Sequence, residues 1–108
     1  MPSIEQYIQQ HYADQGLGAK AVSEYFKISP SYLSRIFRAD MGIGVVDYIH
    51  RVRIDAAKKL LRSATSNLDE IAIQVGFSNR WVLIRTFKQL EGITPGIYRL
   101  HQAKTART

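Results

Sequence analysis

The sequence predicts an all-α fold of about seven helices, in which a long central helix joins two tandem helix-turn-helix units. Apolar residues recur every three or four positions along most of the chain, which is the period of helices with one buried face. Glycines and serine-proline or threonine-proline pairs separate these segments. The second half of the chain also repeats the first at an offset of about 50 residues. We therefore expect one unit over residues 1–44, the central helix over 45–62 and the other unit over 63–108.

The first unit is expected to open with a helix that ends before Gly16 and Gly18, because glycine interrupts helices. The apolar and aromatic face of this helix holds Ile4, Tyr7, Ile8, His11 and Tyr12. We expect His11 to line this face rather than to bind a ligand. A second, short helix is predicted over residues 17–26.

The next helix has a strong start signal. Ser29 offers a capping hydroxyl, and Pro30 fits the first helical position, where no N–H is required. Gly42 ends the helix. Its expected inner side carries Tyr32, Leu33, Ile36 and Phe37, and its outer side carries Ser31, Ser34, Arg35 and Arg38.

The central helix is expected to run unbroken from Val45 to Arg62, because this stretch holds no glycine or proline. At about 1.5 Å per residue it would span roughly 27 Å. Each unit of about fifty residues would be marginally stable alone, so this helix should contribute to both cores. The residues available for that role are Val46, Ile49, Val52 or Arg53, Ala56, Ala57, Leu60 and Leu61. Arg53 would then be structural, pairing within the central helix.

The second unit begins with a polar connector over residues 63–67, in which Ser66 or Asn67 is expected to cap the next helix. Asp69 and Glu70 fall in the first turn of that helix, where the helix dipole favours negative charge. We therefore interpret these two carboxylates as structural rather than catalytic.

Three further signals divide the second unit. Gly76 can adopt the left-handed conformation that ends a helix, and Ser78 or Asn79 can cap the helix that follows. Thr94-Pro95 repeats the combination of a cap and a first-turn proline. A closing helix is expected from there to about residue 102, and the tail after it is expected to fray.

The helix that follows Asn79 has two faces of different chemistry. Its expected core face holds Val82, Leu83, Thr86, Phe87 and Leu90. Its opposite face holds Trp81, Ile84, Arg85 and Lys88, an unusual set for solvent. The major groove of DNA would accommodate it, because arginine can bond guanine bidentately, apolar groups can meet thymine methyls and lysine can meet phosphate. The alternative for Trp81 is to fold back and cover the rim of the core.

An internal repeat relates the two units. Adding 50 maps Leu33 on Leu83, Arg35 on Arg85, Phe37 on Phe87, Arg38 on Lys88, Gly42 on Gly92, Ile43 on Ile93 and Tyr48 on Tyr98. Before the turn the offset is 49, which maps Val22 on Ile71, Phe26 on Val75 and Ile28 on Phe77. Matched core residues alone would fit two generic helices. The outward pair Arg35 and Arg85 is more specific, because solvent does not require arginine over lysine.

A longer signature lies in the second unit: Gly76-Phe77-Ser78, Arg85, Phe87-Lys88, Gly92, Thr94-Pro95 and Tyr98-Arg99. In this order and spacing the chain resembles the AraC/XylS family of bacterial transcription regulators over nearly its whole length. The family usually has a small polar residue at Trp81, an aromatic at Leu83 and a polar residue at Ile84, so the chain departs from the pattern there. The resemblance implies two helix-turn-helix units that bind DNA.

The resemblance also implies which side chains contact DNA. By position, bases would be read by Ser31, Ser34 and Arg35 in the first unit and by Arg80, Trp81, Ile84 and Arg85 in the second. Phosphates would be contacted by Ser29, Arg38, Ser78, Asn79, Lys88 and Thr94, with helix N-termini assisting.

Composition excludes several other classes of protein. No apolar run approaches the roughly 18 residues of a transmembrane helix, and the first residues lack the features of a signal peptide. The absence of cysteine excludes disulfides, thiol catalysis and the cysteine-dependent DNA-repair methyl acceptors related to this fold. The histidines His11, His50 and His101 lie far apart, and no phosphate-binding glycine loop follows a strand. We therefore expect no enzyme, no metal and no cofactor.

The net charge of +6 is unevenly distributed. Residues 1–26 hold one lysine and three acidic residues, a balance of −2, whereas residues 27–108 hold fourteen cations and six acidic residues, a balance of +8. A basic body of this kind suits a chain that presents one surface to a polyanion.

The sequence therefore predicts sequence-specific binding of double-stranded DNA by part of a bacterial transcription regulator, an activator in the cytoplasm. One monomer would place two recognition helices in successive major grooves, with RNA polymerase as a further partner and no membrane contact. Any dimerisation would use a domain that this chain lacks, and the chain is either an excised piece or a complete small regulator. The alternative is an RNA-binding or protein-interaction module of helical hairpins.

Overall fold

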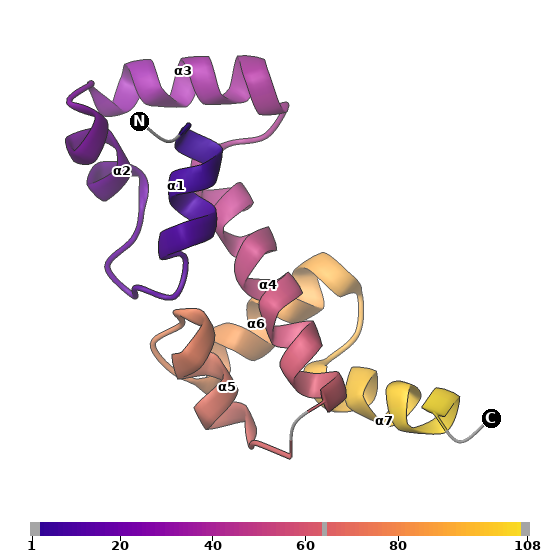
Figure 1. Cartoon of the computed structure of the whole chain (residues 1–108). Helices are drawn as coiled ribbons and strands as arrows, with labels where there is room; N and C mark the ends of the chain where they lie inside the picture. The colour runs from indigo at the N-terminus through magenta and orange to yellow at the C-terminus, as the bar shows by residue number, and fades with distance from the viewer. Residues whose placement is uncertain (1–2, 64, 107–108) are drawn as a thin grey trace.

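The computed structural model describes residues 3–63 and 65–106, and within these ranges it contains seven helices and no strand (Figure 1). The helices are α1 (Ile4–His11), α2 (Ala19–Phe26), α3 (Pro30–Met41), α4 (Val45–Ser63), α5 (Leu68–Val75), α6 (Arg80–Glu91) and α7 (Pro95–Ala106). The predicted all-α class with two helix-turn-helix units and a central helix is confirmed. In the described part of the chain no helix is both long enough and apolar enough to span a bilayer.

The long helix α4 connects the two ends of an elongated molecule that measures 48 × 24 × 24 Å. In Figure 1, α1, α2 and α3 gather at one end of α4, and α5, α6 and α7 gather at the other. Two separate groups of buried residues correspond to these ends. The division of the chain at residues 44 and 62 stays a prediction, because α4 belongs to both groups.

The first core packs α1, α2 and α3 against the start of α4. Its buried members are Ile8, Leu17, Val22, Leu33, Phe37, Val45 and Ile49. The second core packs α5, α6 and α7 against the rest of α4, and its buried members are Ile54, Ala57, Leu61, Ile71, Ala72, Val75, Phe77, Leu83, Phe87 and Tyr98. The central helix therefore contributes to both cores, as its sequence predicts.

Most helix boundaries follow the punctuation in the sequence. Ser29 and Asn79 accept hydrogen bonds from the first turns of α3 and α6, and Asn67 does so for α5. The C-terminal residues of α3, α5 and α6 are followed by glycines with positive φ, namely Gly42, Gly76 and Gly92. Of the paired alternatives, Asn67 rather than Ser66 and Asn79 rather than Ser78 are the caps.

The internal repeat is visible in the packing of aromatic rings. Phe37 and Tyr48 meet edge to face with centroids 5.4 Å apart and planes at 64°. Their counterparts Phe87 and Tyr98 meet at 5.5 Å and 66°. Tyr48 lies on α4 and Tyr98 on α7. The start of α4 in the first unit is therefore structurally equivalent to α7 in the second.

Several detailed expectations are wrong. Tyr32 is exposed rather than internal, and Val46 is exposed because Val45 and Ile49, one turn apart, take the inward positions on α4. The closing helix does not end near residue 102 but continues to Ala106, so residues 103–106 of the expected frayed tail are helical. Ala64 in the connector and the last two residues of the tail lie outside the described residues.

Two other boundaries move by one or two residues. The second helix begins at Ala19 rather than at Leu17, whose side chain is buried in the first core although its backbone precedes the helix. The central helix runs to Ser63, one residue further than expected. Neither shift changes which residues face the two cores.

Candidate nucleic-acid interface

Helix α3 presents a polar and cationic outer face. Leu33 and Phe37 hold the helix against the first core. The opposite side exposes the predicted contact residues Ser31, Ser34, Arg35 and Arg38. The helix thus separates its anchoring residues from side chains that are available to a partner, as the spacing in the sequence predicts.

Helix α6 presents a different outer face. Leu83, Thr86 and Phe87 are buried, whereas Arg85 and Lys88 are exposed and Ile84 is half-buried. Trp81 is 69% exposed, so it does not fold back onto the core. A tryptophan this open to solvent in a small domain is unusual, because a large aromatic surface is normally buried.

Arg80, at the start of α6, is held by a carboxylate from α5. Its Nε donates to Oδ1 of Asp69 at 2.8 Å, and its Nη2 donates to Oδ2 at 2.6 Å. This bidentate pairing lowers the pKa of Asp69 and raises the pKa of Arg80. The sequence predicts that Arg80 reads a base, and in this structure Asp69 already occupies its Nε and one hydrogen of its Nη2.

The guanidinium of Arg80 also lies 5.9 Å from the centroid of the Trp81 ring. Asp69, Arg80 and Trp81 therefore form a continuous exposed array from α5 to the outer face of α6. A comparable contact occurs on α3, where the guanidinium of Arg35 lies 5.3 Å from the ring centroid of the exposed Tyr32. Each outer face thus carries an arginine beside an exposed aromatic ring.

Tyr32 was not among the predicted contact residues. The helical period places Tyr32 on the inner side with Leu33, Ile36 and Phe37, whereas the structure leaves it 45% exposed. The proximity of Arg35 is the structural signal that identifies it.

Helix N-termini supply the backbone donors expected for phosphate. The Ser29 hydroxyl accepts from Tyr32 N at 3.1 Å, Asn79 Oδ1 accepts from Val82 N at 3.1 Å, and Thr94 Oγ1 accepts from Ile97 N at 3.3 Å. These three side-chain oxygens therefore act as caps. Ser78 is exposed just ahead of α6, and Arg38 and Lys88 are exposed near the C-terminal ends of α3 and α6.

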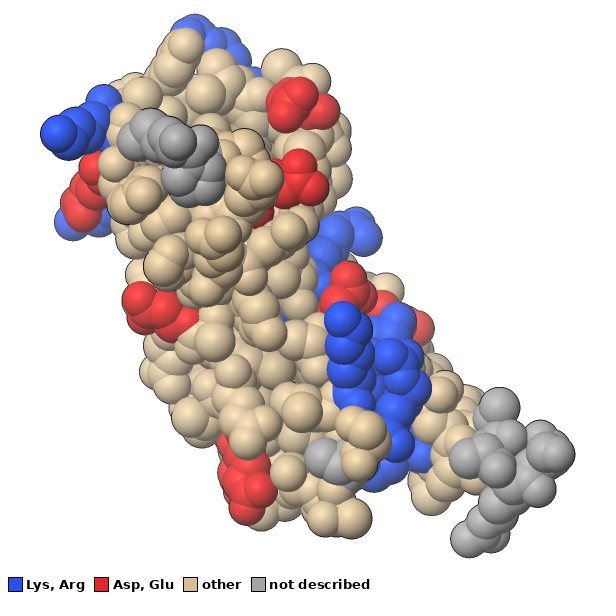
Figure 2. Space-filling model, viewed as in Figure 1, with Lys and Arg blue, Asp and Glu red and all other residues tan. Residues whose placement is uncertain are grey.

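Charge is unevenly spread over the surface. In the view of Figure 2, Lys and Arg side chains gather over the half of the molecule that carries α7, whereas uncharged surface dominates much of the other half. Among the described residues the two ion pairs are Lys58–Glu91 and Arg80–Asp69, so neither Arg35 nor Arg85 is engaged in one. The two repeated arginines therefore differ from Arg80 in being available to a polyanion.

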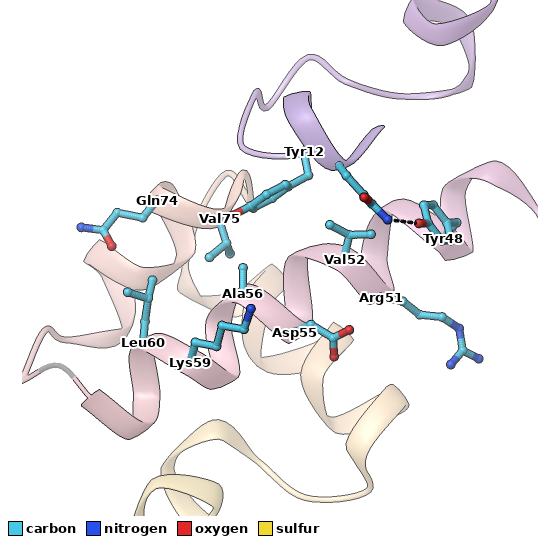
Figure 3. Close-up of a pocket in the computed structure, with 11 residues that line it drawn as sticks. Tyr12, Tyr48, Arg51, Val52, Asp55, Ala56, Lys59, Leu60, Gln74 and Val75 are labelled. Carbon is cyan, nitrogen blue, oxygen red and sulfur yellow. Dashed lines mark hydrogen bonds between the residues drawn. The ribbon is translucent and has the colours of Figure 1, made fainter. Parts of the chain in front are cut away.

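A groove of about 750 Å³ runs along α4 between α1 and α5 (Figure 3). Val52, Ala56 and Leu60 form its apolar floor, and Gln9 Nε2 donates to the Tyr48 hydroxyl at 2.9 Å on its rim. Burial raises the pKa of Tyr48. The lining includes no nucleophile paired with a base, and in the described residues no three His, Asp or Glu side chains gather into a potential metal site.

The chain matches the family model described as "Helix-turn-helix domain" over residues 22–101. It is 34% identical over 94 residues to the arabinose operon regulatory protein of Escherichia coli (strain K12), which is 87% of this chain and 32% of that protein. The chain thus spans about a third of the length of that curated relative.

Two solved structures have the same fold. One is the C-terminal domain of AraT, a response regulator from Geobacillus stearothermophilus, with a TM-score of 0.88 and 33% identity, covering 91% of this chain and 81% of that chain. The other is the DNA-binding domain of AdpA, a global transcriptional factor, in complex with a target DNA. Its TM-score is 0.86 at 23% identity, with 96% of this chain and 91% of that chain covered, and it supports the fold.

Proposed function

The chain belongs to the AraC/XylS family of transcription regulators, as an AraC-type helix-turn-helix DNA-binding domain, and we propose that it places α3 and α6 in successive major-groove segments of double-stranded DNA. The observation that carries this proposal is the repeated outward arginine. Arg35 and Arg85 occupy equivalent positions in the two units, both are exposed, and neither is in an ion pair among the described residues. Arginine at such a position is the commonest reader of guanine.

The base contacts would come from two unlike faces. Ser31, Ser34 and Arg35 on α3 offer hydrogen bonds, whereas Arg80, Trp81, Ile84 and Arg85 on α6 combine two cations with an apolar surface. Phosphate contacts would come from Ser29, Arg38, Ser78, Asn79, Lys88 and Thr94, assisted by backbone N–H groups at the starts of α3, α6 and α7. The binding site on DNA would therefore be asymmetric.

One chain suffices for this mode of binding. The molecule is 48 Å long, which exceeds the roughly 34 Å of one turn of DNA. It carries α3 and α6 in the two units that gather at opposite ends of α4. A longer protein containing this domain would act in the bacterial cytoplasm as an activator that contacts RNA polymerase. Any dimerisation would then fall to a part of that protein other than this domain.

Selection of binding sites from random duplexes tests the proposal. An enriched, asymmetric site with two conserved segments about one turn apart supports it. The control is the RNA duplex of the same sequence in the same gel-shift assay, because the A-form major groove is too narrow for a helix. Equal affinity for the RNA duplex, or no enrichment of any sequence, would contradict the proposal.

A further inference from the structure

A buried arginine lies where the two units meet. Arg53, in the middle of α4, is only 6% exposed. Its Nε donates to the carbonyl of Tyr12 at 2.8 Å, and its Nη2 donates to the carbonyl of Asp14 at 2.9 Å. The expectation that Arg53 pairs within α4 is therefore wrong, because its partners lie about forty residues away in the loop between α1 and α2.

The loop that Arg53 holds is itself tied to the first unit. Asp14 N donates to the carbonyl of His11, Leu17 N donates to the carbonyl of Asp14, and Gly16 N donates to Asp14 Oδ1. Leu17 is buried in the first core. Displacement of this loop would therefore displace residues on which α1 and the first core depend.

The same guanidinium reaches the second unit. It lies 5.5 Å from the ring centroid of Phe77, which is buried in the second core and lies three residues before the start of α6. Tyr12 also packs against the second core. One side chain on α4 thus contacts the loop of the first unit and the turn that leads into the candidate recognition helix of the second.

Gly76 shows how closely the units approach at this point. A Cβ atom at this residue would collide with the carbonyl oxygen of Tyr12 and would lie 2.8 Å from Arg53 Nε. Its φ of +104° also disfavours any residue with a side chain. The equivalent turn residue in the first unit is Lys27, which carries an exposed side chain at φ 58°.

A buried cation is a poor means of gaining stability, because its desolvation offsets much of the attraction that it makes. Burial also lowers the pKa of Arg53, although the Asp14 carboxylate opposes that change. The planar guanidinium bonds two backbone carbonyls at once, so the loop is held in one orientation relative to α4. A lysine ammonium is a compact charge with rotatable donors and would not fix that orientation. The geometry therefore fits a role in orientation.

We propose that Arg53 is a positioning residue that fixes α3 relative to α6 and thereby determines the separation between the two DNA segments that the chain accepts. Arg53 lies between the Tyr12 and Asp14 carbonyls on one side and the Gly76–Phe77 turn on the other. This inference rests on the proposed DNA binding. A helix as long as α4 can bend, and a bend would change the position of α3 relative to α6. The contacts of Arg53 add a second connection beside the helix, which removes that freedom.

A distance measurement between the units tests this role of Arg53 without DNA. The chain has no cysteine, so spin labels can be attached at Ala39→Cys on α3 and Gln89→Cys on α6, two exposed positions related by the repeat. We expect one narrow distance distribution in the otherwise unchanged chain. Arg53→Lys and Arg53→Met should broaden it, whereas the matched control Arg51→Lys, on an exposed position of the same helix, should not.

The functional readout is the spacing preference on the selected duplex. The parent chain should favour the selected spacing over one lengthened by a single base pair by about tenfold, and Arg53→Lys should reduce that ratio to about threefold or less at equal folded fraction. Gly76→Ala perturbs the same contact from the other side and should reproduce both effects, compared with the parent chain at equal folded fraction.

Unchanged distance width and unchanged spacing preference in the folded variants would overturn the inference. Failure of the proposed function shows differently, as absence of specific duplex binding by the parent chain. The spin-label distances then still decide whether Arg53 fixes the two units relative to each other.

Discussion

The two helix-turn-helix units share a backbone plan but use it differently. In both, a residue in the left-handed conformation ends the first helix of the motif, Lys27 at φ 58° and Gly76 at φ 104°. Lysine occupies the first turn, where its side chain is exposed, whereas a side chain at the second turn would collide with Tyr12 and Arg53. The second turn is thus part of the contact between units, and the first is not.

The outer faces differ as well. The face of α3 offers two serines and Arg35, and the face of α6 offers the array Asp69, Arg80 and Trp81 beside Arg85. The repeated arginine is the common element on which both faces are built. The comparison shows that one repeated backbone plan carries two outer faces of different chemistry.

The largest expected effect comes from adding a side chain to the second turn and removing the side chain from the first. Gly76→Ala should destabilise the chain by roughly 2–4 kcal/mol, because it adds the strain of a left-handed residue to a collision with Tyr12. Lys27→Gly should change stability by about 1 kcal/mol or less. Urea unfolding of both variants checks this, and equal losses would show that the turns are equivalent after all.

The two arginines provide the next largest effect. Arg35→Ala and Arg85→Ala should each cost about 1–3 kcal/mol at the selected site and relax the base preference in one segment only. Lys88→Ala should weaken binding to every duplex and reduce the salt dependence. Titrations of specific and random duplexes separate the two patterns, and an equal loss on both for Arg35→Ala would make it a phosphate contact.

Breaking the array of Asp69, Arg80 and Trp81 should have a smaller effect that is confined to the start of α6. Because its pairing with Arg80 lowers the pKa of Asp69, the pair is present at neutral pH and is lost only as pH falls through that lowered pKa. Trp81 fluorescence should therefore stay constant from neutral pH to about pH 4 and change only below it. Asp69→Asn should remove that acid transition, and a transition that persists in this variant would assign it to another group.

Addition of operator DNA should also change Trp81 fluorescence. Trp81→Ala should bind less tightly while melting nearly as the parent chain does, because the side chain is mostly exposed. A large loss of melting temperature with unchanged binding would instead show that Trp81 is structural.

Local signals in the sequence were sufficient for most of the fold. Ser29-Pro30 and Gly42 determine where α3 begins and ends through local capping and backbone conformation, and the repeat identifies Arg35 and Arg85 as equivalent. The length of α7 was missed, because its last residues lack an apolar period to mark them as helical.

The long-range contacts of Arg53 and Arg80 could not be predicted from the sequence, for a different reason. Arg53 bonds carbonyl groups about forty residues away, and a backbone acceptor has no residue-type signature. Asp69 and Arg80 lie eleven residues apart on different helices, so the periodicity within a single helix cannot predict their contact. Long-range partners of this kind depend on how the helices pack, which no pattern of spacing specifies.

The central claim is that one chain reads two unlike groove segments at a fixed separation. Its most direct test inserts half a turn and then a full turn of DNA between the two segments of the selected site. Half a turn should abolish specific binding by rotating one segment away. A full turn restores the facing but not the distance, so the parent chain should retain only the weak binding of a single unit. Recovery of full affinity on the full-turn duplex would contradict a fixed separation between α3 and α6.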